Sequence, residues 1–158
     1  MKRRAVMLAT AFSLSAGASL AFAHHSHPYT YDMCRSIKIE GRVESVQWKD
    51  PHTLIVLRLD DGTAYTVDWA PASRLTGQGI IGPAKAALVF GRRITVTGSP
   101  IRSAAQIREH FPDFKDEVNA NTVDPTLIRS VDDSWNWTRT GGVPVSDALV
   151  PCADATKK

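Results

Sequence analysis

Histidine is the residue type in this sequence with the clearest capacity for chemistry. Three of the five histidines, His24, His25 and His27, fall within the stretch AFAHHSHPYTYDMC. A fourth, His52, follows an aspartate-proline pair. Neutral imidazole is a good ligand for copper, zinc and nickel. This grouping therefore predicts a metal site formed by the N-terminal histidines, with His52 as a more distant candidate ligand.

The value of His24 as a ligand depends on where the mature chain begins. Residues 1–23 place three basic side chains before a short apolar run that ends in Ala21-Phe22-Ala23. This is the layout of a secretory signal peptide, and the run is too short for a stable membrane anchor. We therefore expect cleavage after Ala23, which makes His24 the first residue of a periplasmic or secreted protein.

An N-terminal histidine binds one metal through two groups, its α-amino nitrogen and its ring nitrogen. A further imidazole from His52, His25 or His27 would complete a T-shaped arrangement that suits copper. The leader, residues 24–36, can reach His52 only by doubling back, because a long predicted strand separates them. Cleavage after Ala21 would instead place a histidine third, which favours square-planar copper or nickel.

Two other interpretations of the histidines stay open. The leader can be a polar segment that binds zinc or nickel loosely, as exposed histidine clusters do. It can also have no metal role, with His52 capping the turn between the first two predicted strands. In that case Asp50 would accept hydrogen bonds from nearby backbone groups. Copper, or zinc, is the cofactor that the first interpretation implies.

The charge balance argues against an anionic partner. The chain has 19 basic and 16 acidic residues, and removing Lys2, Arg3 and Arg4 with the signal peptide leaves 16 of each. A net charge of zero offers no electrostatic footprint for nucleic acid or an anionic membrane.

The two cysteines, Cys34 and Cys152, lie near opposite ends of the mature chain, and in an exported protein we expect them to form a disulfide. Free or metal-binding thiols are the alternative.

Residues 37–111 are predicted to form a small five-stranded OB-like barrel with one short helix. The run SIKIEGRVESVQWKD alternates apolar and polar residues, and its phase slips at Ser45, which indicates a β-bulge. TLIVLRLD and TAYTVDW follow as a hairpin around Asp61-Gly62. A short helix is expected in ASRLTGQGI, a fourth strand in GRRITVTG and a fifth from Ala105 to Phe111. This order is that of an OB barrel, and a β-sandwich is the alternative.

Residues 112–158 are predicted to be a C-terminal extension packed on the barrel. Trp135 and Trp137 are two positions apart, so they share a face of an extended chain. We expect them to dock the extension, and a stacking platform for a ligand is the alternative. His110, placed on the fifth strand, is expected to be a partly buried structural residue.

Four segments resemble a widespread family of small secreted bacterial proteins of unknown function: HHSHPYTYD, IKIEGRVESVQWKDPH, APASRLTGQG and LVFGRRITVTG. Members of that family have a processed His-His-Ser N-terminus, then Thr-Gly-x-Val, Trp-x-Asn-Pro-His and Pro-Gly-Asp-x-Val-x-Val-x-Gly. This chain departs from that pattern at Gly41-Arg42-Val43, at Asp50 and at Phe90-Gly91-Arg92. The resemblance covers residues 24–111. It implies an OB-like barrel in the periplasm and no established activity.

The remaining function classes are a binding module and an enzyme. A binding module would use the barrel for a small ligand, a cell-envelope component or a partner protein, with Trp48, Arg42 and Arg58 as candidate contacts. The sequence has no nucleophile elbow, phosphate-binding glycine loop or zinc-protease motif. We therefore do not expect an enzyme, and OB analogy alone does not support nucleic-acid binding. The leading prediction is an exported binding protein with copper at its histidines.

Overall fold

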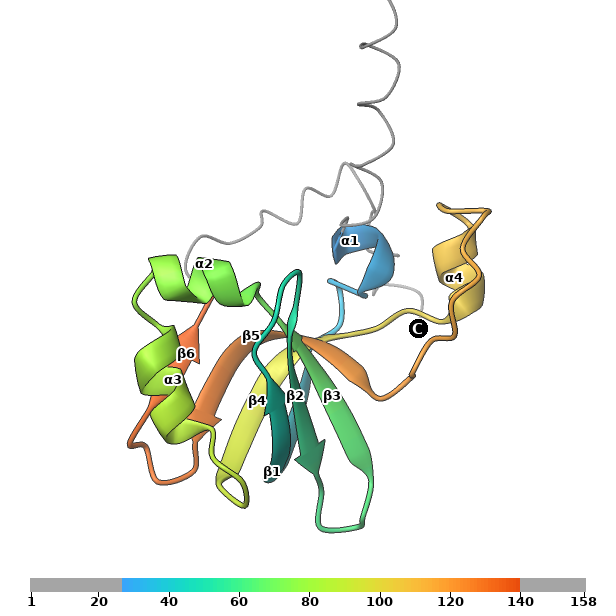
Figure 1. The fold of residues 1–158 in the computed structure, drawn as a ribbon. Helices are drawn as coiled ribbons and strands as arrows, with labels where there is room; N and C mark the ends of the chain where they lie inside the picture. The colour runs from blue at the N-terminus through green and yellow to red at the C-terminus, as the bar shows by residue number, and fades with distance from the viewer. Residues whose placement is uncertain (1–26, 140–158) are drawn as a thin grey trace, which may run out of the picture.

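The computed structural model describes residues 27–139, without the side chain of His27. Within this range no helix is both long and apolar enough to cross a membrane. The predicted signal peptide, His24, His25 and Cys152 lie outside the described residues. In chain order the elements are α1 (His27–Thr30), β1 (Ile37–Gln47), β2 (Thr53–Arg58), β3 (Ala64–Trp69), α2 (Ala72–Gly77), α3 (Ile81–Ala87), β4 (Arg93–Pro100), α4 (Ala104–Arg108), β5 (Thr122–Ser130) and β6 (Asn136–Thr138) (Figure 1).

Five of the strands close into a barrel. β1 pairs antiparallel with both β2 and β4, β2 with β3, and β4 with β5. The ring closes through a parallel pairing of β3 with β5, which joins Thr66 to Thr122 and Val67 to Val123. The resulting order around the barrel, 1-2-3-5-4, is that of a Greek-key OB barrel. The predicted fold class, mainly β with a small five-stranded OB-like barrel, is confirmed, although the described residues form four short helices where one was predicted.

The local signals in β1 and the first hairpin are also confirmed. The register between β1 and β2 shifts between Val43 and Ser45, where the alternation of apolar residues slips. The hairpin turn uses Gly62 at a φ of +85°, a conformation that glycine adopts without steric cost. Asp61 supports the turn by accepting a hydrogen bond from the backbone N–H of Thr63.

The predicted fifth strand at Ala105–Phe111 is wrong. Those residues form α4 and the turn after it, and α4 begins with a capping box. Ser103 accepts a hydrogen bond from the backbone N–H of Gln106, whose side chain accepts one from the backbone N–H of Ser103. Ser-x-x-Gln is a helix-start signal, and the alternating apolar residues outweighed it. His110 is exposed beyond α4, so its predicted place on a strand, partly buried, is also wrong.

The strand that closes the barrel is β5, in the range predicted as the C-terminal extension. Its sequence contains Pro125, which lacks a backbone N–H and is normally confined to strand edges or bulges. The structure accommodates Pro125 opposite Gly98, where the register of β4 and β5 shifts. A Cβ atom on Gly98 would lie 2.2 Å from the backbone oxygen of Asp124. The barrel therefore extends to residue 130 rather than 111.

The core fills the barrel and continues into a tryptophan cluster. Trp69, 2% exposed, lies at its centre. Its ring centroid is 5.1 Å from that of Trp137, 6.2 Å from Trp48 and 6.3 Å from Trp135. These are all four tryptophans of the chain. The prediction that Trp135 and Trp137 dock the C-terminal segment onto the barrel is confirmed.

Candidate metal centre

His52 is positioned by a carboxylate on a neighbouring strand. It lies in the loop between β1 and β2, and its Nδ1 is 2.5 Å from Oδ1 of Asp68. Asp68 lies on β3 between Val67 and Trp69, whose side chains are both buried in the core. Because side chains alternate along a strand, Asp68 must point out of the barrel. The outward face of β3 thus fixes the orientation of the His52 ring.

The same carboxylate also binds a residue that follows the leader helix. The hydroxyl of Tyr31 donates a hydrogen bond to Oδ2 of Asp68. Tyr31 is 3% exposed, and burial together with the negative charge of Asp68 raises the pKa of its hydroxyl above the ordinary value. Tyr31 therefore stays protonated and remains a donor. One oxygen of Asp68 serves Tyr31 and the other serves His52.

Backbone contacts hold this part of the leader against the end of β4. Tyr31 forms a β-bridge with Ile101, and the N–H of Asp32 donates to the carbonyl of Pro100 at 2.8 Å. The N–H of Arg102 donates to the carbonyl of Thr30 at 2.9 Å. Figure 1 shows α1 at the same end of the barrel as the loop between β1 and β2. The leader therefore does double back, and it brings Tyr31 to the carboxylate that holds His52.

The distance that the histidine leader must span is consequently short. Tyr31 lies seven positions after His24, and because α1 covers residues 27–30, the chain between them spans less than the roughly 25 Å of a fully extended segment. Only Asp68 lies between the contacting atoms of Tyr31 and His52. An amino group at His24 is thus within chain reach of His52. Among residues 27–139, no three histidine, cysteine, aspartate or glutamate side chains form a metal-binding group.

A buried carboxylate, Asp124, lies on β5 and acts on the same site. Asp124 is 1% exposed, and it follows Val123, which pairs with the residue before Asp68. Arg139 donates to Oδ1 of Asp124 and, at 2.8 Å, to the carbonyl of Pro125. The charge of Asp124 contributes to the raised pKa of both Tyr31 and His52. At His52 this effect of Asp124 is opposed by the positive charge of Lys49.

The pKa of His52 gives a direct prediction. The hydrogen bond to Asp68 raises it above the ordinary value of 6.5, against an opposing effect of burial. The ion pair should therefore stabilise the fold fully below the unfolded pKa of about 6.5, and this contribution is lost as the pH rises through the folded pKa. An NMR titration of metal-free protein should give a pKa above 6.5 for His52 and a lower one in Asp68→Asn. An unchanged pKa in the variant would contradict the pairing.

The other candidate contacts already have partners within the protein. Arg58 binds Glu44 through two hydrogen bonds, at 2.9 and 3.0 Å. Arg42 donates to the carbonyl of Gly91 at 3.3 Å. Trp48 packs against the central tryptophan, with the ammonium of Lys85 5.7 Å from its ring centroid. Arg42 and Arg58 are cross-strand neighbours, whereas Trp48 belongs to the tryptophan cluster.

His110, which the sequence predicted to be a structural residue, lies next to the leader. The ring centroids of His110 and Tyr29 are 4.6 Å apart, and Phe111 packs edge-on against the same tyrosine at 5.7 Å. Tyr29 is part of α1, so His110 is anchored near the leader from the α4 side. His27 is the first residue of α1. The described histidines therefore gather around the leader helix and the segment that follows it.

Comparison with known proteins identifies a family but no activity. A search of curated proteins found no match. Among solved structures, one chain of the crystal structure of the S. pombe Stn1-Ten1 complex is similar, with 13% identity and a TM-score of 0.42. That alignment covers 63% of this chain and 60% of the other. A family model matches residues 11–108, more than half of the sequence. The protein belongs to DUF6152, a family of unknown function.

Proposed function

We propose that this protein is an exported copper-binding protein whose metal site joins the mature N-terminus to His52. The observation that carries the proposal is the pairing of His52 Nδ1 with Asp68. Histidines that ligate metals commonly donate one ring N–H to a carboxylate, which fixes the ring and makes the other nitrogen a better ligand. His52 thus has the orientation of a ligand that coordinates through Nε2.

The leader supplies the remaining nitrogens. After cleavage at Ala23, His24 offers its α-amino group and its ring, and His52 adds the third nitrogen. Three nitrogens in a T-shaped set suit copper better than zinc, which prefers a tetrahedral set. The carboxylate of Asp68 lies behind His52 and would offset part of the charge of the metal. Tyr31 holds Asp68 from the other side, and it ties the leader to the same carboxylate.

The proposed role is metal binding in the periplasm or outside the cell. The basic, apolar and small-residue order of residues 1–23 supports export. Metal at this site is cargo or a stable ligand of the protein, and we propose no catalytic step. A module that binds a non-metal ligand, an envelope component or a partner protein is the alternative, and it becomes the better explanation if copper does not bind.

Asp68→Asn tests the observation on which this proposal rests. The amide keeps the shape of the side chain but weakens its support of the His52 ring. We expect copper affinity of the mature protein to fall about 10- to 100-fold, the usual effect of losing a carboxylate partner of a ligating histidine. His110→Ala is the matched control, because it removes an imidazole from the same end without touching Asp68. Equal affinities for the Asp68 variant and the unmodified protein would contradict the proposed centre.

A further inference from the structure

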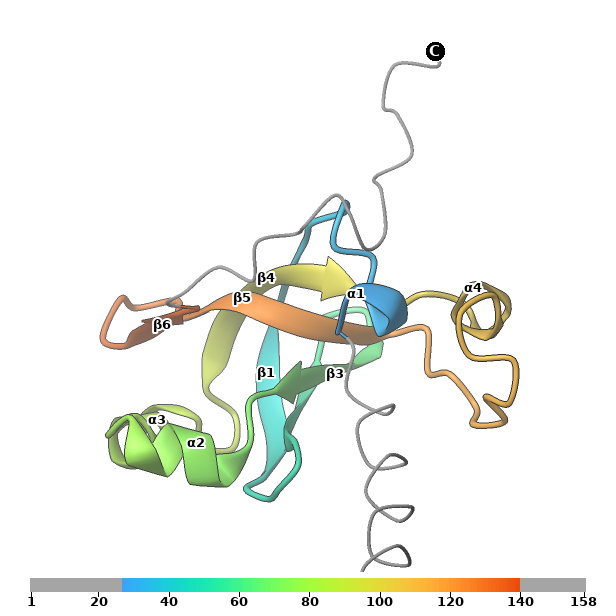
Figure 2. The ribbon, with the colours of Figure 1, turned by 90° about the horizontal axis from the view of Figure 1, so that it is seen from above.

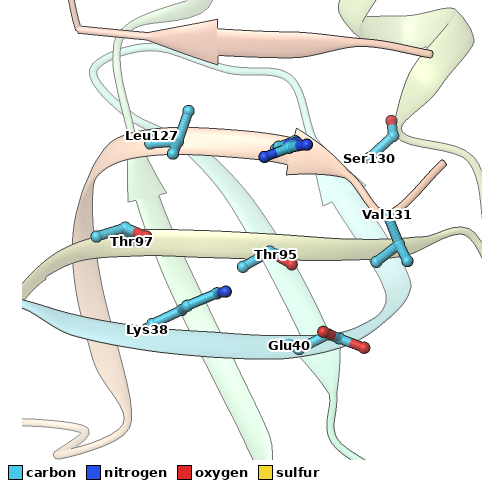
Figure 3. A pocket seen from close by; sticks show the side chains of 8 residues that line it. Lys38, Glu40, Thr95, Thr97, Leu127, Ser130 and Val131 are labelled. Carbon is cyan, nitrogen blue, oxygen red and sulfur yellow. The ribbon is translucent and has the colours of Figure 1, made fainter. Parts of the chain in front are cut away.

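The outer face of β1, β4 and β5 carries a groove of about 300 Å³. Seen from above, α2 and α3 lie on one side of the barrel and α4 lies on the other (Figure 2). The strand pairings place the groove side chains in two rows across the sheet: Lys38 with Thr97 and Leu127, and Glu40 with Thr95 and Arg129 (Figure 3). The threonines of β4 form the floor, and the longer side chains of β1 and β5 form the walls. The volume is at the lower end of the range for small-molecule sites.

Several hydrogen-bond donors in the groove have no partner within residues 27–139. The ammonium of Lys38 makes neither a hydrogen bond nor an ion pair in that range. Arg129 donates from Nε to Asp133, and its two terminal nitrogens donate to no other group there. Among the described residues, the hydroxyls of Thr95 and Thr97 also make no hydrogen bond. A ligand that complements this groove must therefore present acceptors to it.

The charges of the groove leave one cation unbalanced. Oε1 of Glu40 accepts a hydrogen bond from Nε of Arg93 at 2.7 Å, which leaves the other carboxylate oxygen as an acceptor. The charge of Arg129 is balanced by Asp133. Lys38 has no such counter-charge in the part of the chain that the structure describes. The groove therefore combines several donors and a carboxylate acceptor with a single net positive charge.

This set of groups suits a saccharide better than the other common ligand classes. An apolar ligand would remove water from the charged and hydroxyl side chains without replacing their hydrogen bonds, which is costly. A polyanion such as a nucleic acid needs several cations for its phosphates. A sugar hydroxyl, like that of serine or threonine, can both donate and accept. Leu127 and Val131 add a small apolar surface against which the C–H groups of a sugar ring can pack.

We propose that the groove binds an acidic saccharide, a sugar that carries one carboxylate, such as a uronic acid. The carboxylate pairs with Lys38, while the ring hydroxyls bond to the threonines, to Glu40 and to the terminal nitrogens of Arg129. A net charge of zero for the mature protein does not oppose this binding, because a ligand with a single negative charge needs one cation rather than a basic surface. The inference goes beyond the proposed metal binding and does not rest on it.

An NMR titration of the full-length mature protein, without added metal, tests the inference. The probes are glucuronate, galacturonate and mannuronate, each compared with its neutral parent sugar, glucose, galactose or mannose. We expect at least one uronate to give saturable shifts of backbone amides in β4 and β5, and to bind at least about tenfold more tightly than its neutral parent, because the neutral sugar lacks the charged partner of Lys38. No saturable shifts in these strands with any uronate, or equal affinities within every pair, would overturn the proposal.

Lys38→Ala separates binding in the groove from binding elsewhere. Lys38 is exposed, so the substitution leaves the barrel core intact, and Lys115→Ala, at an exposed lysine between α4 and β5, is the matched control. We expect Lys38→Ala to weaken uronate binding by about tenfold, to leave the affinity for the neutral sugar unchanged, and so to remove the preference for the acid. The control should bind both sugars as the unmodified protein does. Unchanged uronate affinity in Lys38→Ala, or an equal loss in both variants, would contradict the pairing of the carboxylate with Lys38.

Discussion

Replacing His52 with alanine is expected to weaken copper binding to the mature protein by about 100-fold or more. The loss of a direct ligand should exceed the 10- to 100-fold effect typical of losing a carboxylate that supports one. Residual binding would come from the amino group and ring of His24 and from its neighbours in the leader. Competition titration against a copper chelator at pH 7 measures the affinity directly.

The fold has to survive the substitution for this result to be interpretable. The side chain of His52 is 27% exposed and lies in a loop, so the change leaves the barrel core intact. Circular dichroism and thermal unfolding of the metal-free variant check this point. His110→Ala, which loses a ring contact with Tyr29 only, should bind copper as the unmodified protein does. Equal affinities for His52→Ala and the unmodified protein would contradict a ligand role for His52.

Replacing Trp69 with alanine is expected to lower the free energy of unfolding by about 3–5 kcal/mol, the usual cost of removing a large buried aromatic side chain. Trp69 contacts the three other tryptophans. The substitution would therefore loosen β6 and the loop at the end of β1 together. Urea unfolding followed by circular dichroism measures the change. The free energy of unfolding of a typical domain is only about 5–15 kcal/mol. The expected decrease for Trp69→Ala is therefore a large fraction of the stability.

Trp69→Phe is the matched control for that experiment. Phenylalanine keeps an aromatic ring in the cluster, and it removes the indole N–H, which is buried without a hydrogen-bond partner in the described part of the protein. An unpaired buried donor is costly, so removing it offsets part of the loss in packing. We expect a distinctly smaller decrease for Trp69→Phe than for Trp69→Ala. A decrease below about 1 kcal/mol for Trp69→Ala would show that the cluster is not a core.

Alternation of apolar and polar residues predicted the first four strands, because each has one face in the core. It failed at β5, where a proline and a register shift disturb the alternation and where Asp124 is buried although aspartate is polar. Residues 105–111 alternated well enough to mimic a strand, although the capping box before them indicated a helix. The barrel was therefore predictable in class, while its closing strand depended on long-range pairing with β3 and β4.

The candidate site, like the barrel, could be predicted from the sequence only in part. The histidines and the aspartate-proline-histidine sequence drew attention to His52, and the signal peptide drew attention to His24. Tyr31 and Asp68 were missed because they are 37 positions apart and join only when the leader doubles back. The one available signal was the aspartate in TAYTVDW, which alternation places on the outer face of a strand. No local pattern in the sequence indicates that a tyrosine beyond the leader helix would bind it.

The most direct test of the account is a double-mutant cycle on copper affinity. One change adds a single residue before His24, which removes the amino chelate, and the other is His52→Ala. If both groups hold one metal ion, each change should weaken binding strongly, and the two together should cost clearly less than the sum of the separate free-energy losses. Additive losses would show that the N-terminus and His52 act on separate ions. No loss from the added residue would contradict the proposed centre.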